Sequence, residues 1–281
     1  MKEEIDMIRK SFSIWSAYDV ELSPEDAVLA IERRGMTECE LSDEHGKMLL
    51  DRGDPEETGR AFREFAASHG VSFPQGHLFL QVALCAENAI DVLTEWIRLF
   101  SAVGIKNAVL HGDWQSFSSD TPDESVVAAT VERLKLLAPI AEKYGVRICL
   151  ENLRRRFDSA KRLVGMIEAV GSDALGICLD TGHLNIAHTE SQEEFIRTAG
   201  KYLHALHIAD NEGVTDQHMM PFGRGSVNIL SVMKTLDEIG YEDLFNYEIP
   251  GERLCPMPVR DAKAAYLKQM TDYLFDTIDH Q

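Results

Sequence analysis

The feature that most constrains this chain is a repeated order of apolar strand, polar loop, amphipathic helix and glycine. Six helix-like segments end near a glycine, which closes a helix in the left-handed conformation with little strain. These glycines are Gly35, Gly70, Gly104, Gly145, Gly171 and Gly240. The first helix has a predicted start as well, with Ser23 as the N-cap, Pro24 as the first helical residue and Asp26 facing free backbone N–H groups. The repeat predicts strands and helices that alternate along the chain.

The segments between the helices are short and mostly apolar, as expected of strands covered by helices on both faces of a parallel sheet. They are predicted at 8–14, 36–41, 72–80, 107–110, 146–150, 175–179, 203–208 and 244–248, with a last helix over 261–278. An open doubly wound sheet is the alternative, but no Gly-x-Gly-x-x-Gly pattern follows the first strand. Eight units in 281 residues suit a (β/α)8 barrel, which needs about 250 residues. We therefore predict an α/β fold with a single TIM barrel domain over residues 1–281.

The cysteines and the N-terminus indicate a cytoplasmic protein. The five cysteines are scattered, odd in number and never in a Cys-x-x-Cys pattern, and Cys149 and Cys178 lie in apolar runs where a free thiol behaves as a small hydrophobe. The first ten residues mix both charge signs and lack the apolar run of a signal peptide. No stretch approaches the roughly 20 apolar residues of a membrane span. We expect no membrane partner.

The formal net charge of −19 bears on the choice of partner. Such a charge opposes the general attraction to phosphate backbones that supplies much of nucleic-acid affinity. A small molecule is therefore favoured over a nucleic acid as the ligand. Association of identical copies is a further expectation, because barrels often pair through their helices or loops.

Polar side chains follow one predicted strand after another. In a barrel of this kind the catalytic groups lie at the C-terminal ends of the strands and on the loops that follow them. The residues at these positions are His77, His111, Glu151, Asp180, His183, His207 and Glu248. His204 comes three residues before His207, so strand alternation places it on the opposite side, as a packed or hydrogen-bonded histidine. The sequence thus gathers carboxylates and imidazoles at one end of the barrel.

Four of these residues suit a divalent metal. Any one carboxylate at a strand end is more often a helix cap or an ion-pair partner, but the four together favour ligands. Three carboxylates and one imidazole suit Mn²⁺, Mg²⁺, Co²⁺ or Zn²⁺, and without a cation the carboxylates would repel each other. The predicted tetrad is Glu151, Asp180, His207 and Glu248.

Six motifs occur in a fixed order along the chain. They are LHGDW at 110–114, LENL at 150–153, LDTGH at 179–183, HIAD at 207–210, DQHMMPFGRGSVNI at 216–229 and YEIPGE at 247–252. In this order and spacing they resemble the xylose-isomerase-like barrels, which comprise sugar and sugar phosphate isomerases and epimerases as well as endonuclease-IV-type enzymes. Together with the eight-unit repeat, the resemblance spans nearly the whole chain.

The isomerase and epimerase branch implies one reading of the site. In that branch the four predicted ligands hold one metal, and Glu151 and Glu248 are also the acid/base pair that moves a proton through an enediolate. His183 resembles the histidine that hydrogen-bonds the polarised substrate oxygen. The resemblance therefore implies a sugar or sugar phosphate as substrate. The side chains expected to contact it are His77, His111, Trp114 and Arg224.

One departure from the branch concerns an arginine. Tagatose/psicose-epimerase-like members carry an arginine shortly after the metal histidine, where it holds substrate oxygens. Residues 209–218 contain no arginine, and the nearest is Arg224 in PFGRGS. Arg224 is the expected substitute. The sugar, its phosphorylation and the choice between isomerisation and epimerisation stay open.

The endonuclease-IV-type branch implies another reading. The chain resembles it at every zinc-ligand position, and the Asp216-x-His218 pair is the most telling because a four-residue metal site does not need it. A multi-zinc cluster would activate water for cleavage of abasic DNA. The positions are His77, His111, Glu151, Asp180, His183, His207, Asp216, His218 and Glu248. The acidic charge and short acidic loops oppose this reading. A third alternative is a barrel that binds metal or sugar without turnover.

Overall fold

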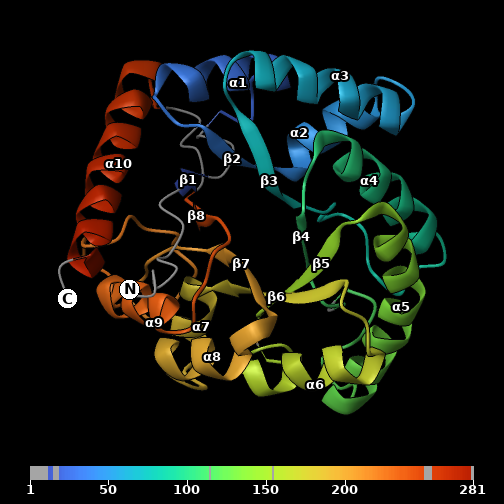
Figure 1. Cartoon of the computed structure of the whole chain (residues 1–281). Coiled ribbons are helices and arrows are strands. Elements are labelled where there is room, and N and C mark those ends of the chain that lie inside the picture. Colours follow the sequence, from blue (N-terminus) through green and yellow to red (C-terminus); the bar gives the residue numbers. More distant parts are fainter. Residues whose placement is uncertain (1–11, 15–18, 114, 154, 250–254, 280–281) are drawn as a thin grey trace, which may run out of the picture.

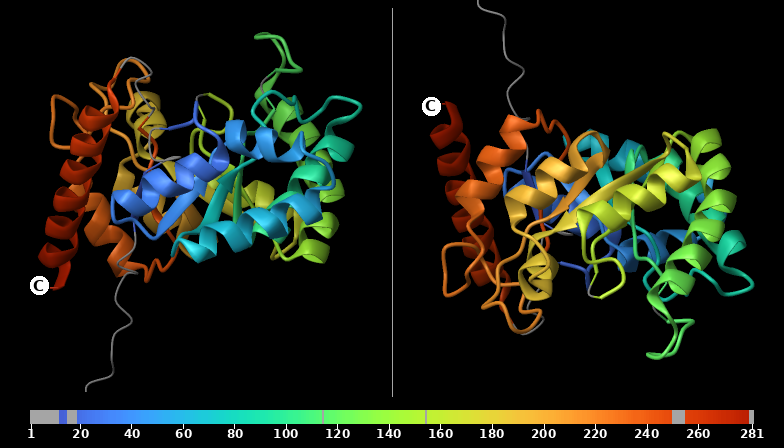
Figure 2. Two further views of the ribbon diagram at one scale, coloured as in Figure 1. Left: turned by 90° about the horizontal axis from the view of Figure 1, so that it is seen from above. Right: turned by 90° about the horizontal axis from the view of Figure 1, so that it is seen from below.

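A computed structural model of the chain describes residues 12–14, 19–113, 115–153, 155–249 and 255–279. Within these residues a ring of parallel strands is enclosed by a ring of helices (Figure 1). The fold is the (β/α)8 barrel that the sequence predicts. Seen from its side, the barrel has helices running alongside the strands (Figure 2). The loops between them therefore gather at its two ends. None of the described helices is long and apolar enough to cross a membrane.

The strands close into a barrel through two sheets that meet at their edges. One parallel sheet runs in the order β2-β3-β4-β5-β6-β7, and β1 pairs with β8 in parallel. A parallel bridge from Ile208 to Tyr247 joins β7 to β8. The strands are β1 (Phe12–Ile14), β2 (Glu38–Leu41), β3 (Ser72–His77), β4 (Asn107–Leu110), β5 (Arg147–Glu151), β6 (Leu175–Asp180), β7 (Leu203–His207) and β8 (Phe245–Tyr247). The predicted first strand begins outside the described residues, and the predicted third strand ends at His77, three residues early.

The helices include three that the repeat does not predict. They are α2, α7 and α8, and two of them begin almost directly at a strand end, with Ser42 capping α2 and Asp180 capping α7. No polar loop separates α2 and α7 from the strands before them, and such a loop is the feature from which the sequence predicts the start of a helix. The helices are α1 (Pro24–Arg33), α2 (Asp43–Leu50), α3 (Pro55–Ser68), α4 (Ala89–Val103), α5 (Asp123–Tyr144), α6 (Ala160–Val170), α7 (Thr181–Ala187), α8 (Gln192–Ala199), α9 (Ile229–Glu238) and α10 (Met257–Asp279).

The predicted helix ends are confirmed. Ser23 Oγ accepts a hydrogen bond from the Asp26 backbone N–H at 3.1 Å and caps α1. The six glycines predicted to follow helices all have a positive φ, from +66° at Gly145 to +100° at Gly104. Local sequence therefore determines where most helices begin and end.

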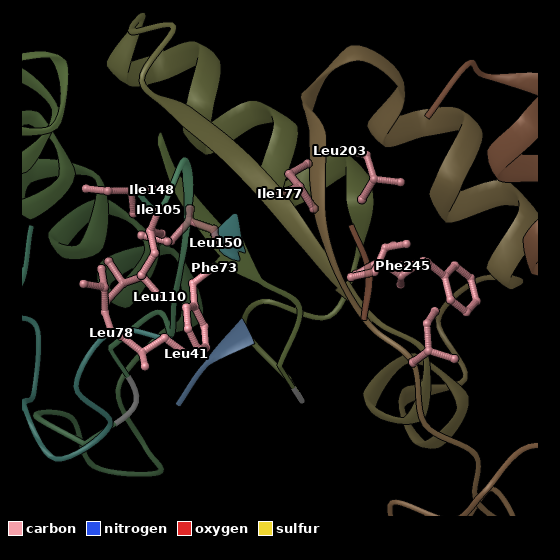
Figure 3. Packing of buried hydrophobic residues seen from close by; sticks show 14 of the residues in the cluster. Leu41, Phe73, Leu78, Ile105, Leu110, Ile148, Leu150, Ile177, Leu203 and Phe245 are labelled. Atoms are coloured by element: carbon pink, nitrogen blue, oxygen red, sulfur yellow. The ribbon is translucent and has the colours of Figure 1, made fainter. Parts of the chain in front are cut away.

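Alternate residues of each strand face opposite sides of the barrel wall. Leu110, Ile148 and Ile177 belong to the large apolar core that the helices cover (Figure 3). Val109, Cys149 and Cys178, which are next to them along the strands, and Ala205 of β7 are fully buried and form a separate small cluster, which fills the inside of the barrel. The next inward positions along β5, β6 and β7 are Glu151, Asp180 and His207. The same alternation that packs the barrel thus turns the polar residues inward at its C-terminal end.

Candidate metal centre and its pocket

The predicted tetrad comes together at the C-terminal ends of four consecutive strands. Glu151, Asp180 and His207 are the last residues of β5, β6 and β7, and Glu248 directly follows β8. Each offers one ligand atom, and these four atoms all lie within 4.8 Å of one another. The first three are nearly inaccessible to solvent, and the Glu248 side chain is 13% exposed. The arrangement converges on one point at the mouth of the barrel.

Asp180 is fixed by two roles at once. Its Oδ1 accepts a hydrogen bond from the His183 backbone N–H at 2.7 Å and so caps α7. Its backbone is held by Asn152, whose side-chain amide donates to the Asp180 carbonyl at 2.9 Å and accepts from the Asp180 N–H at 2.6 Å. The second carboxylate oxygen, Oδ2, stays directed at the tetrad. A helix cap and a metal ligand are therefore compatible in one side chain.

Four buried polar atoms of the tetrad have no hydrogen-bond partner. They are Glu151 Oε1, Asp180 Oδ2, His207 Nδ1 and Glu248 Oε2. His207 Nδ1 lies 3.4 Å from both Glu151 Oε1 and Glu248 Oε2, but in neither case with hydrogen-bond geometry. Burying a polar atom without a partner costs free energy, so four together indicate a missing common partner. Three carboxylate oxygens and one imidazole nitrogen fit a divalent cation.

Three further histidines surround Glu151. His111 Nε2 lies 2.9 Å and His77 Nε2 3.5 Å from Glu151 Oε2, while His183 Nδ1 lies 3.1 Å from Oε1. His77 is buried, and its ring stacks on that of His207 with 5.6 Å between centroids. All four histidines predicted from strand ends therefore contact Glu151 or its neighbours.

Two glutamates of the tetrad differ in their affinity for protons. Burial would raise the pKa of Glu151, but the imidazoles of His111 and His207 outweigh burial and hold that pKa well below its usual range. For Glu248, burial together with the charge of Glu151 raises the pKa to about 8. Titratable pairs whose pKa values are pushed apart are typical of acid/base sites.

A second group of potential ligands lies farther out. His183 Nε2 is 3.2 Å from Asp216 Oδ2, and His218 Nε2 is 3.2 Å from Asp216 Oδ1. Burial opposes the charged form of both histidines. Asp180 and Asp216 outweigh burial at His183 and raise its pKa well above the usual value, and Asp216 with other nearby carboxylates raises the pKa of His218 to about 10. His218 also has a left-handed backbone, with φ of 44°. The Asp216-x-His218 pair thus joins His183 beside the tetrad.

Asp210 anchors the loop after β7 that carries Asp216 and His218. The Asp210 carboxylate accepts hydrogen bonds from the backbone N–H groups of Asn211 at 2.8 Å and Val227 at 2.9 Å. Its backbone pairs with Met219 in both directions. The two ends of the loop are therefore tied to one residue just past β7. Asp210 thus begins this loop and anchors it.

A pocket of about 600 Å³ opens beside the second group. Phe117, Leu153 and Phe157 supply apolar walls, and Arg155 lines the pocket as well. His183 and Asp216 form the part that borders the metal centre. Arg155 has a left-handed backbone, with φ of 73°, and donates to the Ser119 carbonyl at 3.0 Å. A pocket of this size and mixed lining suits a small organic molecule.

The remaining predicted site residues lie elsewhere or cannot be placed. The Arg224 side chain is 82% exposed and forms an ion pair with Glu212 at 2.6 Å, so the structure does not bring it to the tetrad. Trp114 lies outside the described residues. His204, predicted as a packed or hydrogen-bonded histidine and not as a site residue, has its Nδ1 2.9 Å from Asp243 Oδ2, at the other end of the barrel from the tetrad.

Two residues near the site were missed by sequence reasoning. Glu40, in β2, is fully buried and reaches His207, and Arg155 reaches the pocket from the loop after β5. The sequence gives no signal for Glu40, because it lies inside a short strand rather than after one and shares that strand with Glu38. Nothing in the sequence around Arg155 predicts the loop conformation that places it.

The chain was compared with protein families and with known structures. A family model described as xylose isomerase-like TIM barrel matches residues 28–274. The chain belongs to this family. The predicted resemblance is thereby confirmed, and the family's fold agrees with the barrel described above.

Individual relatives are more distant. An inosose isomerase of Bacillus velezensis is 28% identical over 134 residues, 45% of this chain and 48% of that protein. The first curated relatives are likewise matched over only about half of their own length. An L-ribulose 3-epimerase of Mesorhizobium japonicum is 24% identical over 84% of this chain and 78% of its own. The structure of a D-psicose 3-epimerase with D-tagatose from Clostridium cellulolyticum H10 has a TM-score of 0.78 at 19% identity, covering 94% of this chain and 99% of that one.

Proposed function

We propose that the protein is a divalent-metal-dependent isomerase or epimerase of a sugar or sugar phosphate. The observation that carries the proposal is the set of four unpartnered buried atoms, one from each member of the tetrad. The relatives named as an inosose isomerase and an L-ribulose 3-epimerase support a sugar as substrate. A cation held by Glu151, Asp180, His207 and Glu248 would act as a Lewis acid toward the carbonyl and hydroxyl oxygens of the substrate.

Glu151 and Glu248 would move the proton. Their carboxylates approach His207 Nδ1 from different strands, so they flank the place where a substrate would bind. One carboxylate removes the proton from the carbon next to the carbonyl, which gives an enediolate, and the other returns a proton to the adjacent carbon or to the opposite face. His183 would donate a hydrogen bond to the substrate oxygen on which charge develops.

The substrate would extend from the metal centre into the pocket. His183 and Asp216 line the pocket and lie beside the tetrad, so a sugar bound at the tetrad could extend into the pocket. Arg155 and the apolar walls would contact its far end. His77 and His111 lie behind Glu151, and we expect them to shape the metal centre more than to contact the sugar.

Exchange of a substrate C–H proton with solvent tests the reaction. Metal-loaded protein is incubated in D₂O with a panel of ketoses, keto-inositols and ketose phosphates, and deuterium is located by NMR. We expect deuterium at the carbon next to the carbonyl, and about 10²–10⁴-fold slower exchange in Glu151→Gln and Glu248→Gln. A protein that binds metal and sugar but exchanges no proton would instead support the binding barrel without turnover.

The grouping of His183, Asp216 and His218 favours one second candidate, a multi-zinc phosphodiesterase acting on abasic DNA. This grouping, the tetrad and the set of His77, Glu151 and His207 are three groups with metal-ligand spacing. Nicking of an abasic duplex at low protein concentration, without proton exchange in any sugar, would favour this candidate. The charge of −19 opposes it.

A further inference from the structure

Behind His207, on the side away from the tetrad, lies a buried carboxylate that the proposed reaction does not use. Glu40 is fully buried, and its Oε1 and Oε2 lie 3.2 and 3.1 Å from His207 Nε2. The other ring nitrogen, Nδ1, faces the oxygens of Glu151 and Glu248. Since a carboxylate can only accept, His207 Nε2 must be the donor in this contact. Nε2 of His207 therefore contacts Glu40, and Nδ1 faces the tetrad.

The Glu40 carboxylate is itself held by two amides. Gln75 Nε2 donates to Glu40 Oε2 at 2.7 Å, and Asn246 Nδ2 donates to the same oxygen. Ser13 Oγ donates to Asn246 Oδ1, which fixes the direction of that amide, and accepts from the Glu40 backbone N–H at 3.3 Å. All these side chains are fully buried. Oε2 is thus committed to two donors, and the orientation of the carboxylate is set by three neighbouring strands.

We propose that Glu40 is a positioning residue that selects the tautomer of His207, accepting the Nε2–H so that the Nδ1 lone pair is free to bind the metal. This rests on the metal site proposed above. A carboxylate behind a metal-binding imidazole orients the ring and raises its basicity, and its loss typically lowers metal affinity about 10–100-fold. Glu40 touches neither the metal position nor the pocket, so it acts only through His207.

The geometry makes the Glu40→Gln variant informative. The amides of Gln75 and Asn246 require an oxygen at the Oε2 position, so the new NH₂ group would take the Oε1 position, 3.2 Å from His207 Nε2. The Nε2–H would then face a donor at the Oε1 position, and its remaining acceptor, the oxygen at the Oε2 position 3.1 Å away, is shared with the two amides. The proton is therefore held less firmly on Nε2, and the form with the proton on Nδ1, which lacks the lone pair that a metal needs, becomes more populated. Replacement of one oxygen by NH₂ would thus weaken a ligand on the opposite side of the ring.

The first measurement is the affinity for Zn²⁺ and Mn²⁺, by competition with a chromophoric chelator. We expect Glu40→Gln to weaken binding at least tenfold, and Glu40→Asp, which keeps an acceptor, to weaken it less. Asn107→Ala is the matched control, because Asn107 is a buried amide that bonds the His204 carbonyl and Asp243 at the far end of the barrel. The control should lose stability but keep wild-type affinity. Binding by Glu40→Gln within twofold of wild type would overturn the inference.

A second measurement needs no folded variant. In the wild-type protein loaded with Zn²⁺, ¹⁵N-edited NMR of the imidazoles should show His207 with a proton on Nε2 and the metal on Nδ1. Zinc bound through Nε2 would overturn the inference even if every substitution at Glu40 prevented folding. A wild-type protein that takes up no divalent metal would instead overturn the metal site itself, and the role of Glu40 with it.

Discussion

The Asp210 carboxylate lies directly against Gly225, where a Cβ would come within 2.0 Å of Asp210 Cγ. Because Asp210 is bonded to both ends of the loop that carries Asp216 and His218, the added methyl group of Gly225→Ala should displace the Asp210 carboxylate and break its hydrogen bonds to the loop. We expect a loss of about 1–3 kcal/mol in unfolding free energy, measured by urea denaturation. Gly165→Ala is the control, since that helical glycine has open space beside it and should be neutral or slightly stabilising. Equal stability of the two variants would contradict the close approach.

Metal content should depend on the face of β7 from which a histidine projects. We expect His207→Ala to lose most of the bound divalent metal and Glu248→Gln to weaken its retention, as measured by elemental analysis of untagged protein after dialysis. His204→Ala, on the same strand but paired with Asp243, should retain the wild-type content. Unchanged content in both tetrad variants would sink the assignment of the ligands.

Metal uptake should release protons near neutral pH. Burial opposes the charged form of His207, but the carboxylates of Glu248, Glu40 and Glu151 outweigh burial and raise the pKa of His207 well above its usual value. For Glu248, burial raises the pKa to about 8. The metal-free site therefore holds protons that a cation must displace, so apparent affinity should increase from pH 6 to about pH 8. Calorimetry in two buffers of different ionisation enthalpy counts the released protons. Uptake independent of pH over this interval would contradict the expectation.

The metal-free protein should lose stability in alkali. Burial opposes the charged forms of His77 and His218, but Glu151 and Asp216 raise their pKa values to about 9 and about 10. The folded state then keeps protons that the unfolded state has lost, so this contribution is complete below about pH 6.5 and disappears as pH rises through 9 and 10. The urea midpoint should fall between pH 7 and 10, and less steeply in His218→Asn. A constant midpoint in the wild type would be inconsistent with these shifts.

Two arginines compete for the role of holding the far end of the substrate. Arg155 lines the pocket, whereas Arg224 pairs with Glu212 on the surface. We expect Arg155→Gln to raise KM about tenfold with little change in kcat, because it removes an interaction made equally in ground and transition states. Arg224→Gln should change KM less than about twofold. A larger increase in KM for Arg224→Gln than for Arg155→Gln would instead support the sequence-based prediction that Arg224 contacts the sugar.

The convergence of polar side chains at the strand ends could be predicted because two simple signals coincide there. Glu151, Asp180 and His207 each end an apolar run, and in a parallel barrel all such ends meet at one mouth. Glu40 gives no such signal, since it stands within β2 and shares the strand with another glutamate, Glu38. Only the register of four strands reveals that it faces His207.

The walls of the pocket could not be predicted for a different reason. Phe117, Arg155 and Phe157 lie on irregular loops, where no periodicity fixes the direction of a side chain. Arg155 has a left-handed backbone, and its side chain donates to the carbonyl of Ser119, 36 residues away in the sequence. Loop residues determine substrate choice in barrels, so the least predictable part of the chain is also the part that would select the sugar.

The small cluster inside the barrel limits how the proposed cation could reach the tetrad. Val109, Cys149, Cys178 and Ala205 are fully buried directly beneath it, so they offer no path through the interior of the barrel. Under the proposed function, cation and sugar would both approach from the mouth of the barrel, and a sugar bound there would lie between the cation and the solvent. A chelator should then remove metal more slowly from protein saturated with substrate than from protein without substrate.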